Sequence, residues 1–476
     1  MSQKPTIGTL GESGSSSGEQ SHFITRPVAG SGAADHGAGP GSRLSRRRFL
    51  AASAATLALP SLLSSRALGL ADVPPPSERI SLGIIGCGGM GTGNTQSFLR
   101  EKGCQIVAAC DVDQTHLADL TKVVNTHYGN SGCKAYTHFR EVLARRDIDA
   151  VVLSVPDHWH AVVAVEAARQ KKDIYGEKPL ARTIAEQQAI VRAVQQNQRI
   201  WQTGSWQRSV PLFRKAAEII RNGMIGKVTR IEVGLPAGHN DSGKSGQYKT
   251  PSAPPPELDY DTWIGPSKMM PYIRARIHKN WRWNYNTGGG QLMDWIGHHC
   301  DIAHWGCDLD RSGPSEIEGR GEFPAEDAVW NTCTKYFIEL KYPGDIKMVI
   351  AGGYPEIRSG VKWIGTDGWV YADRGVFEAS NEEWRDYKDL PEELRKVKLY
   401  QSNNHQKNFL DCVRSRQPAI TPAETAHHSS IPGHLGLISM LVGRKIKWDV
   451  ATEQIPDDPQ ATKFLGRAYR PPWTLG

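Results

Sequence analysis

The hydrophobic positions in the first half of the chain alternate between short continuous runs and runs with helical spacing. The continuous runs predict strands at residues 80–85, 105–110, 134–137, 150–155 and 173–176. The spaced runs between them predict helices at residues 94–102, 117–123, 139–143 and 161–170. Short apolar strands that alternate with helices form parallel sheets with helices on both faces. We therefore expect residues 79–205 to form an α/β domain with a doubly wound parallel sheet.

The pattern changes after residue 200. A helix predicted at residues 213–221 is followed by strands at residues 229–235, 316–323, 332–340, 347–351, 362–364 and 369–372. Turns rich in Gly, Pro and Asp separate these strands closely, which favours antiparallel pairing. Two more helices are predicted at residues 409–413 and 435–442. We expect an α+β domain with a large, mostly antiparallel sheet over residues 206–455, and a C-terminal tail over residues 456–476.

One long stretch, residues 239–271, fits neither pattern and is rich in proline. A loop of this length inside a domain is usually functional or an interface arm. We expect it to cover a cleft or to contact a neighbouring subunit. We also expect a homo-oligomer that forms through the sheet of the C-terminal domain.

The N-terminal region precedes both domains. Residues 1–42 are rich in Gly, Ser and Ala without hydrophobic periodicity, so we expect a disordered tail. Consecutive arginines at 46–48 precede a short, weakly apolar run, which is typical of a twin-arginine export signal over residues 43–71. The alternative is a basic disordered tail. The signal predicts a periplasmic or otherwise exported protein that uses the twin-arginine export machinery.

The charge of the chain is placed unevenly. The formal net charge is +7, but residues 1–71 hold seven basic and three acidic residues, a surplus of four, so the remainder carries only +3. No basic run occurs in that remainder, which argues against nucleic-acid binding. The eight cysteines are scattered without a C-x-x-C motif, so neither a disulfide framework nor a zinc knuckle is indicated.

The first predicted strand ends in a glycine motif of the form G-x-G-x-x-G, made by Gly86, Gly88 and Gly91. The first glycine allows a tight turn, the second allows a pyrophosphate to approach the backbone, and the third allows the helix to pack closely. The helix N-terminus then directs free N–H groups at the phosphates. Asp111 ends the second strand, where a carboxylate would bind the ribose hydroxyls. A structural turn is the alternative, but this context predicts a Rossmann dinucleotide site.

Two further loops follow predicted strands at the same edge of the sheet. The loop from Pro156 to His160 should border the nicotinamide end of the cofactor. Lys178 lies between Glu177 and a proline and is well placed to face a substrate, although a solvated surface lysine is the alternative. The predicted cofactor-binding residues are Gly86, Gly88, Gly89, Met90, Gly91, Asp111, Pro156, His160, Glu177 and Lys178.

These motifs, ISLGIIGCGGMG, CDVD, VPDHWHAVVAVEAA and GEKPL, occur in an order and spacing that resembles the glucose–fructose oxidoreductase and inositol dehydrogenase family, Gfo/Idh/MocA. The resemblance extends over residues 79–455 and implies a role in the active site for Lys178. Asp111 in the acidic position favours NAD over NADP, because an NADP site more often has an Arg or Ser nearby for the 2′-phosphate.

A second chemical centre follows three glycines at 288–290. Asp294, His298 and Asp301 are spaced to share one face of the next helix. An Asp and a His one turn apart suit an acid–base pair in which the carboxylate orients the imidazole. Two alternatives remain: a purely structural histidine, or a metal site that uses Asp294, His298, His299, Asp301 and His304. The family resemblance implies a catalytic trio of Lys178, Asp294 and His298, with no metal.

We therefore predict an exported NAD-dependent oxidoreductase that acts on a secondary alcohol of a sugar, glycoside or cyclitol and keeps its cofactor tightly bound. His298 would exchange the hydroxyl proton, Lys178 would stabilise the oxygen, and Asp294 would orient His298 and the substrate. The predicted substrate contacts are Trp159, Trp206, Trp281, Trp283, His299 and Asp301, with a buried core position as the alternative for each tryptophan. The alternative functions are an NAD-dependent glycosidase with transient oxidation and a non-catalytic sugar-binding module.

Overall fold

The structure, a computed structural model, describes residues 74–240, 246–325 and 328–475. The predicted disordered tail and twin-arginine signal lie outside these residues. Within them, no helix combines the length and the apolar character that a membrane crossing requires.

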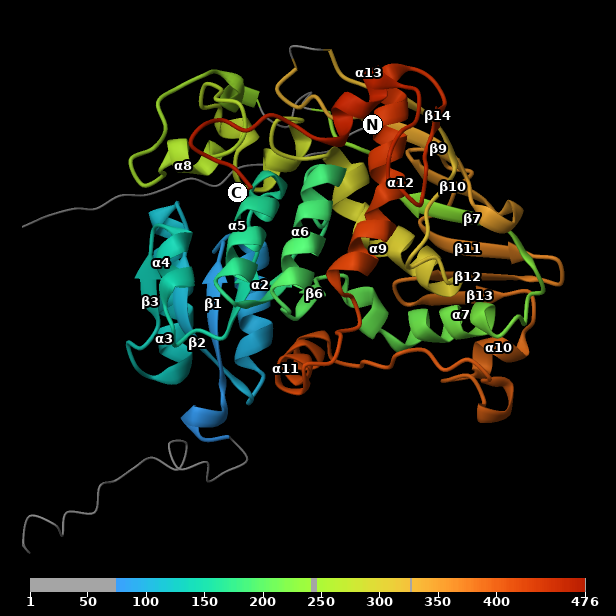
Figure 1. The fold of residues 1–476 in the computed structure, drawn as a ribbon, viewed down its shortest axis with the longest axis horizontal. Coiled ribbons are helices and arrows are strands. Elements are labelled where there is room, and N and C mark those ends of the chain that lie inside the picture. The colour runs from blue at the N-terminus through green and yellow to red at the C-terminus, as the bar shows by residue number, and fades with distance from the viewer. Residues whose placement is uncertain (1–73, 241–245, 326–327, 476) are drawn as a thin grey trace, which may run out of the picture. The chain divides into compact units, whose positions relative to one another are not determined.

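The N-terminal domain contains the predicted parallel sheet, which has six strands in the order β3-β2-β1-β4-β5-β6 (Figure 1). The sixth strand, β6, was not predicted. Its strands are β1 (Ile80–Ile85), β2 (Cys104–Cys110), β3 (Lys134–Tyr136), β4 (Ala150–Leu153), β5 (Asp173–Gly176) and β6 (Trp201–Thr203). Its helices are α2 (Gly89–Leu99), α3 (Gln114–Tyr128), α4 (Phe139–Ala144), α5 (Asp157–Arg169) and α6 (Ile184–Gln196). Every residue of β4 is buried, which explains its continuous apolar sequence.

The strand order reverses beside β1, because β2 lies on one side of it and β4 on the other. Helices that follow these two strands pack on opposite faces of the sheet and leave a crevice at their carboxyl ends. The glycine motif and the first turn of α5 both lie at this crevice. The loop expected from Pro156 to His160 is thus mostly helical, because α5 begins at Asp157.

The C-terminal domain contains an eight-stranded sheet in the order β13-β12-β11-β7-β10-β9-β8-β14. Its strands are β7 (Val228–Leu235), β8 (Glu316–Glu322), β9 (Lys335–Lys341), β10 (Lys347–Gly352), β11 (Gly360–Gly365), β12 (Trp369–Asp373), β13 (Val376–Ala379) and β14 (Ile446–Lys447). The pairing of β10 with β7 is parallel, whereas the other pairings between neighbouring strands of this sheet are antiparallel. The expected α+β domain is confirmed.

Three helices pack on this sheet and against one another: α7 (Pro211–Arg221), α9 (Gly290–Gly306) and α12 (Ala423–Val442). Helix α9 contacts β7 and β11, and α12 contacts both α9 and α6 of the first domain. Figure 1 shows α9 and α12 between the two sheets. Their apolar side chains form the largest core cluster with the inner face of the sheet. Helix α9 is therefore held rigidly beside the N-terminal domain.

The segment predicted as a C-terminal tail folds back onto the N-terminal domain. After α11 (His405–Ser415) and α12, the chain forms α13 (Pro459–Thr462) and continues to Trp473. Trp473 is 9% exposed, and its ring centroid lies 4.6 Å from that of Trp159. The prediction missed this packing because the apolar residues in the segment are too few to show a periodicity.

Candidate functional site

A cleft of about 690 Å³ opens at the carboxyl edge of the parallel sheet and extends to the second domain. It contains most of the residues that the sequence predicted. Those that line it are Gly86, Gly88, Gly89, Met90, Asp111, Pro156, Trp159, His160, Glu177, Lys178, Trp281, Trp283 and Asp294. The glycine motif, the lysine loop and the start of α9 are thus brought together although more than 200 residues separate the ends of this set.

The glycine motif joins β1 to α2 as expected. Gly86 has a φ of +93°, a conformation that favours glycine, and turns the chain at the end of the strand. A Cβ on Gly91 would lie 1.8 Å from the carbonyl oxygen of Gly86, so this glycine packs the helix onto the strand and does not line the cleft. Around Gly88 and Gly89, an added Cβ would meet no atom within 4 Å.

These features fit a dinucleotide. Helix α2 begins without a side-chain cap, so its first amides are available to a pyrophosphate in the open space above Gly88. Asp111 ends β2 at the cleft, where its Oδ2 accepts a 2.6 Å hydrogen bond from the amide of Cys87. Its Oδ1 accepts from the amide of Asp113 at 2.9 Å. The carboxylate is therefore fixed in position to bind ribose hydroxyls.

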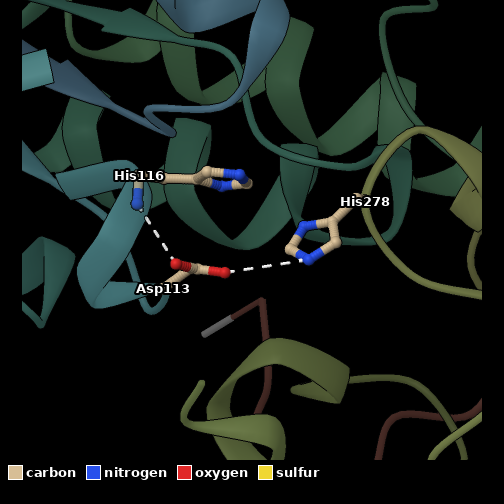
Figure 2. Close-up of side chains that lie close together, drawn as sticks. All are labelled: Asp113, His116 and His278. Carbon is tan, nitrogen blue, oxygen red and sulfur yellow. Dashed lines mark hydrogen bonds and ion pairs between the residues drawn. The ribbon is translucent and has the colours of Figure 1, made fainter. Parts of the chain in front are cut away.

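Three residues that the sequence analysis did not assign gather at the Asp111 end of the cleft. Figure 2 shows Asp113, His116 and His278, the last from the second domain, with their side chains close together. Asp113 caps α3 through Oδ1, and its Oδ2 lies 3.8 Å from Nε2 of His278. The histidine ring centroids are 4.8 Å apart. The donor atoms of the three residues lie within 4.8 Å of one another, so the second domain reaches across the cleft here.

The long segment predicted to cover a cleft lies along the same wall. Asp113 pairs with Leu258 in an isolated antiparallel bridge, and the amide of Asp259 donates to the carbonyl of Val112 at 3.0 Å. Thr262 and Trp263 then line the cleft itself. The described part of the segment is thus attached to the carboxyl end of β2, beside the ribose-binding position.

At the opposite end of the cleft, Lys178 and Asp294 form an ion pair. The Lys178 ammonium donates to Oδ1 of Asp294 at 3.0 Å and to its carbonyl oxygen at 2.8 Å. Nε of Arg282 donates to the same Oδ1 at 2.8 Å. Burial alone would raise the pKa of Asp294, but the two cations hold it below its usual range. Asp294 is therefore ionised and held between two positive groups.

His298 lies close to Lys178 but is not bound to Asp294. It is 7% exposed and lines a second cavity of about 680 Å³, which shares Met90, Glu177 and Lys178 with the cleft. Its Nδ1 is buried without a hydrogen-bond partner among the described residues. Burial lowers the pKa of His298 well below its usual value, and nearby cations, Lys178 first among them, lower it further. The imidazole is therefore neutral at pH 7.

The predicted pairing of Asp294 with His298 is therefore wrong. One helical turn does separate the two residues, but the Asp294 carboxylate is turned toward Lys178 and Arg282. A carboxylate bonded to two cations in a buried site gains more than one bonded to a neutral ring. Asp294 positions Lys178, and the imidazole of His298 remains available to another group.

The other polar residues of α9 bind the protein itself. Asp301 is 1% exposed, and both its oxygens accept from Arg208, at 2.7 and 2.9 Å. His299 contacts the carbonyl of Gly234 at 2.8 Å and lies 3.3 Å from Asp373. The prediction that His299 and Asp301 contact a substrate is corrected, because neither reaches a cavity.

The metal site proposed for α9 is not formed either. His304 contacts the hydroxyl of Tyr342 at 2.8 Å, while Asp301 faces Arg208 and Asp294 faces Lys178. Residues spaced along a helix that suit metal ligation thus point to different partners.

The four tryptophans differ in their access to substrate. Trp159, Trp281 and Trp283 line the cleft, but each is buried and leaves little surface for a sugar. Trp206 is 39% exposed and lies in the second cavity, with its ring centroid 6.3 Å from that of His298. Trp206 is thus the tryptophan of this set that is placed for sugar stacking.

Other functional candidates were missed. Arg282 binds Asp294, and Asp157 lines the cleft with a buried Oδ1 that has no hydrogen-bond partner. Burial raises the pKa of Asp157 to about 7. The VPDHWH motif contained a signal for Asp157, because the residue directly follows Pro156. No local signal identified Arg374, which lies beside Trp206 in the second cavity.

Curated relatives match parts of the chain. A protein of Shewanella sp. strain ANA-3 named glycosyl hydrolase family 109 protein 2 is 34% identical over 178 residues, 33% of this chain and 38% of that protein. Inositol 2-dehydrogenase of Salmonella typhimurium is 28% identical over 202 residues, 42% of this chain and 56% of the enzyme. The chain thus spans between about a third and a little over half of these relatives' length.

Solved structures share the fold. The WlbA dehydrogenase of Bordetella pertussis, solved in complex with NADH and UDP-GlcNAcA, superposes with a TM-score of 0.58 at 16% identity. The match covers 79% of this chain and 99% of that one.

Family models match both domains. The model described as the oxidoreductase family, NAD-binding Rossmann fold, matches residues 80–205. The model described as the oxidoreductase family, C-terminal alpha/beta domain, matches residues 211–475 and so includes the folded C-terminal segment. The second match alone spans more than half of the chain. The chain belongs to the Gfo/Idh/MocA oxidoreductase family, with NAD as the cofactor of its N-terminal domain.

Proposed function

We propose that this protein is an exported NAD-dependent oxidoreductase that acts on a secondary alcohol of a sugar, glycoside or cyclitol and retains its cofactor. The observation that carries the proposal is that Lys178 borders both the cleft that fits a dinucleotide and the second cavity, which His298 also lines. The sugar or cyclitol class is supported by the names of the relatives.

The residues divide the work as follows. Bound NAD supplies the acceptor for the hydride that leaves the substrate carbon. Neutral His298 accepts the proton when the hydroxyl O–H bond breaks. Lys178 uses two of its three N–H donors on Asp294, which leaves one for the substrate oxygen as negative charge develops there. The ion pair with Asp294 holds this lysine in its orientation.

The segment along the cleft supports retention of the cofactor. It is attached to the end of β2 at Val112 and Asp113, and His278 closes the gap opposite Asp113. A nucleotide with its ribose at Asp111 would leave only after these contacts open. Retention suits an exported enzyme, since free NAD is scarce outside the cytoplasm, and it demands that a second substrate or a later step reoxidise the cofactor in place.

Nucleotide content tests retention. Protein purified from the periplasm and dialysed extensively should release about one NAD per chain on denaturation, and a sugar or glycoside from a panel should change the absorbance of the bound nucleotide. Protein that arrives empty, and that works only with millimolar NAD supplied, would contradict the retained-cofactor proposal.

Two further experiments test export and assembly. Loss of transport when Arg46 and Arg47 are replaced by lysine would support the twin-arginine route. Light scattering would measure the oligomeric state.

A glycosidase that oxidises transiently is the second candidate, and the family 109 name of a relative favours it. It would use the same residues but return the hydride to the same molecule. Release of free sugar from an aryl glycoside, with no net change in the bound nucleotide, would identify this reaction.

A further inference from the structure

The second cavity contains a positive group that the proposed reaction does not use. Arg374 occupies the two-residue turn that joins β12 to β13, because Asp373 pairs directly with Val376. Its side chain lines the cavity together with His298, Lys178 and Trp206. The hairpin is held against α9, where His299 lies 3.3 Å from Asp373.

Two indole rings fix the plane of this guanidinium. The central carbon of Arg374 lies 4.8 Å from the ring centroid of Trp206 and 4.6 Å from that of Trp295. With two rings in contact with the guanidinium, its N–H donors are its means of binding a further group. Nε and one terminal nitrogen donate to Oε1 of Gln207, at 3.3 and 3.1 Å. Among the described residues, the other terminal nitrogen has no acceptor.

The guanidinium of Arg374 also forms no ion pair among the described parts of the chain, whereas Arg208 and Arg282 in the same region each pair with an aspartate. The neighbouring Asp373 accepts from the backbone amide of Arg374 at 2.7 Å, but its carboxylate does not reach the guanidinium. Arg100, on the rim of the same cavity, likewise has no carboxylate partner there and donates to Ser97.

Two acids line this cavity, but neither lies within ion-pair distance of the Arg374 guanidinium. Glu177 accepts from Asn94 at 2.9 Å, and Glu101 accepts from Asn404 at 2.8 Å. A half-buried cation without a counter-ion is costly unless a ligand supplies the missing charge. The cavity therefore presents a fixed positive edge beside the group that exchanges the proton.

We propose that the second cavity selects a sugar acid, a uronate or aldonate or its glycoside, whose carboxylate binds the edge of Arg374. This inference rests on the proposed function for the identity of the reacting alcohol, but the carboxylate itself takes no part in the bond changes. A planar carboxylate matches the planar edge of a guanidinium better than a tetrahedral phosphate or sulfate does. Exposed Trp206 would stack on the sugar ring.

The charge of such a substrate also suits His298. Arg374 and Lys178 are among the groups that lower the pKa of His298. A bound carboxylate would offset part of this positive field and make the imidazole a stronger base only when the substrate is in place. An anionic sugar thus activates the base that a neutral sugar would leave weak.

The test uses the full-length holoenzyme and pairs of methyl glycosides that differ only at C6, with glucose, galactose and mannose configurations. Affinity is measured by quenching of tryptophan fluorescence, and turnover by the absorbance of the bound nucleotide. We expect the best uronide to bind about 10- to 100-fold more tightly than its neutral partner, the range for a charge-assisted hydrogen bond. Its affinity should fall as salt rises from 10 mM to 500 mM, while that of the neutral glycoside should change little.

Arg374→Met should remove the preference for the uronide, because methionine can fill the space between the indoles without a charge. Arg374→Lys should keep part of it. The matched control is Arg358→Met: Arg358 also lies over an aromatic ring, Tyr371, but it pairs with Glu378 and lines neither cavity. This control should leave the uronide preference intact, and melting temperatures verify that each variant folds.

Equal affinity for both members of every pair, or an equal loss for both in Arg374→Met, would overturn the inference. A preference for 6-sulfate or 6-phosphate sugars over uronides would overturn the assignment of a carboxylate. If neutral sugars change the bound nucleotide without any uronide preference, the inference fails while the proposed function stands. If a uronide binds through Arg374 but no substrate changes the nucleotide, the proposed function fails instead.

Discussion

At the scale of single residues, the chemistry of the site depends on which charged side chains already form ion pairs within the protein. Asp294 is bound by two cations, and Asp301 by Arg208, so both carboxylates hold other side chains in position. Among the described residues, His298 binds no carboxylate, and it lines the second cavity next to Lys178. This position in the cavity is the reason that we expect His298 to exchange the substrate proton.

Replacing His298 with alanine should lower turnover about 10²- to 10⁴-fold, which is the usual contribution of a positioned acid or base. Nucleotide content should stay at one per chain, because His298 does not line the larger cleft. Since its pKa lies well below the usual value, protonation should not limit wild-type activity between pH 6.5 and 8. Steady-state kinetics across that range test both points. A fully active variant would remove His298 from the mechanism.

Asp157 should make stability depend on pH. Its pKa is raised to about 7 in the folded protein but is about 4 in the unfolded chain, so the unfolded chain loses the proton first. The free energy of unfolding should therefore fall, through this group, as pH rises from about 4 to about 7. Asp157→Asn removes that dependence, and the difference between the variant and the wild type in urea denaturation at pH 5 and pH 8 measures it. If the difference in the free energy of unfolding between the variant and the wild type is the same at pH 5 and pH 8, Asp157 is ionised in the folded protein.

At the scale of elements, the site depends on how closely α9 approaches the loop after β5. A Cβ on Gly297 would lie 2.8 Å from Cβ of Lys178. The carbonyl of Gly297 also accepts from Ser205 at 2.8 Å. Because Gly297 has no side chain, α9 and the lysine loop can approach closely enough for Lys178 to pair with Asp294.

Gly297→Ala should displace Lys178 and reduce turnover by at least about tenfold, because small misplacements of catalytic groups are costly. Gly313→Ala is the matched control: Gly313 lines neither cavity, and an added Cβ there would meet no atom closer than 3.6 Å. That control should keep full activity and change the free energy of unfolding little. Activity and urea denaturation of both variants decide the matter. Equal activity in the two would mean that the backbone absorbs the contact.

At the scale of the molecule, the C-terminal segment ties together parts that border the cleft. Arg467 pairs with Glu186 of α6 at 2.7 Å, and it donates to the hydroxyl of Ser267 and to the carbonyl of His158. The first and last of these contacts lie on the N-terminal domain, and the middle one lies in the segment along the cleft. One side chain thus connects the N-terminal domain to a segment that must move away from it when the cleft opens.

Arg467→Ala should therefore speed the release of bound NAD and destabilise the protein by about 3–5 kcal/mol, because it leaves Glu186 buried without its cation. Arg444→Ala is the control, since Arg444 forms a half-exposed pair with Asp458 away from the cleft. The rate of nucleotide loss during dilution, followed by fluorescence of the reduced cofactor, compares the two. Unchanged release in Arg467→Ala would assign this contact to stability alone.

The sequence by itself determined the fold class and the nucleotide site, since both depend on short-range patterns. The apolar runs of β1 and β4 specify buried parallel strands. Gly86 is required by the positive φ of the turn, and Gly91 by its close contact with the carbonyl of Gly86. Asp111 directly follows β2, the strand that pairs with β1. Such features repeat wherever a strand, a turn and a helix meet in this way.

Tertiary structure alone decided how the polar residues pair. Helical spacing places Asp294, His298 and Asp301 near one another, but it does not show that Lys178, Arg282 and Arg208 compete for the carboxylates. Those cations come from other elements, and a buried carboxylate turns to the partner with the strongest charge. Arg374 is the clearest case: its neighbours Trp206 and Trp295 lie more than 70 residues away in the chain. Only folding brings this cation, without a counter-ion, to the cavity that contains His298.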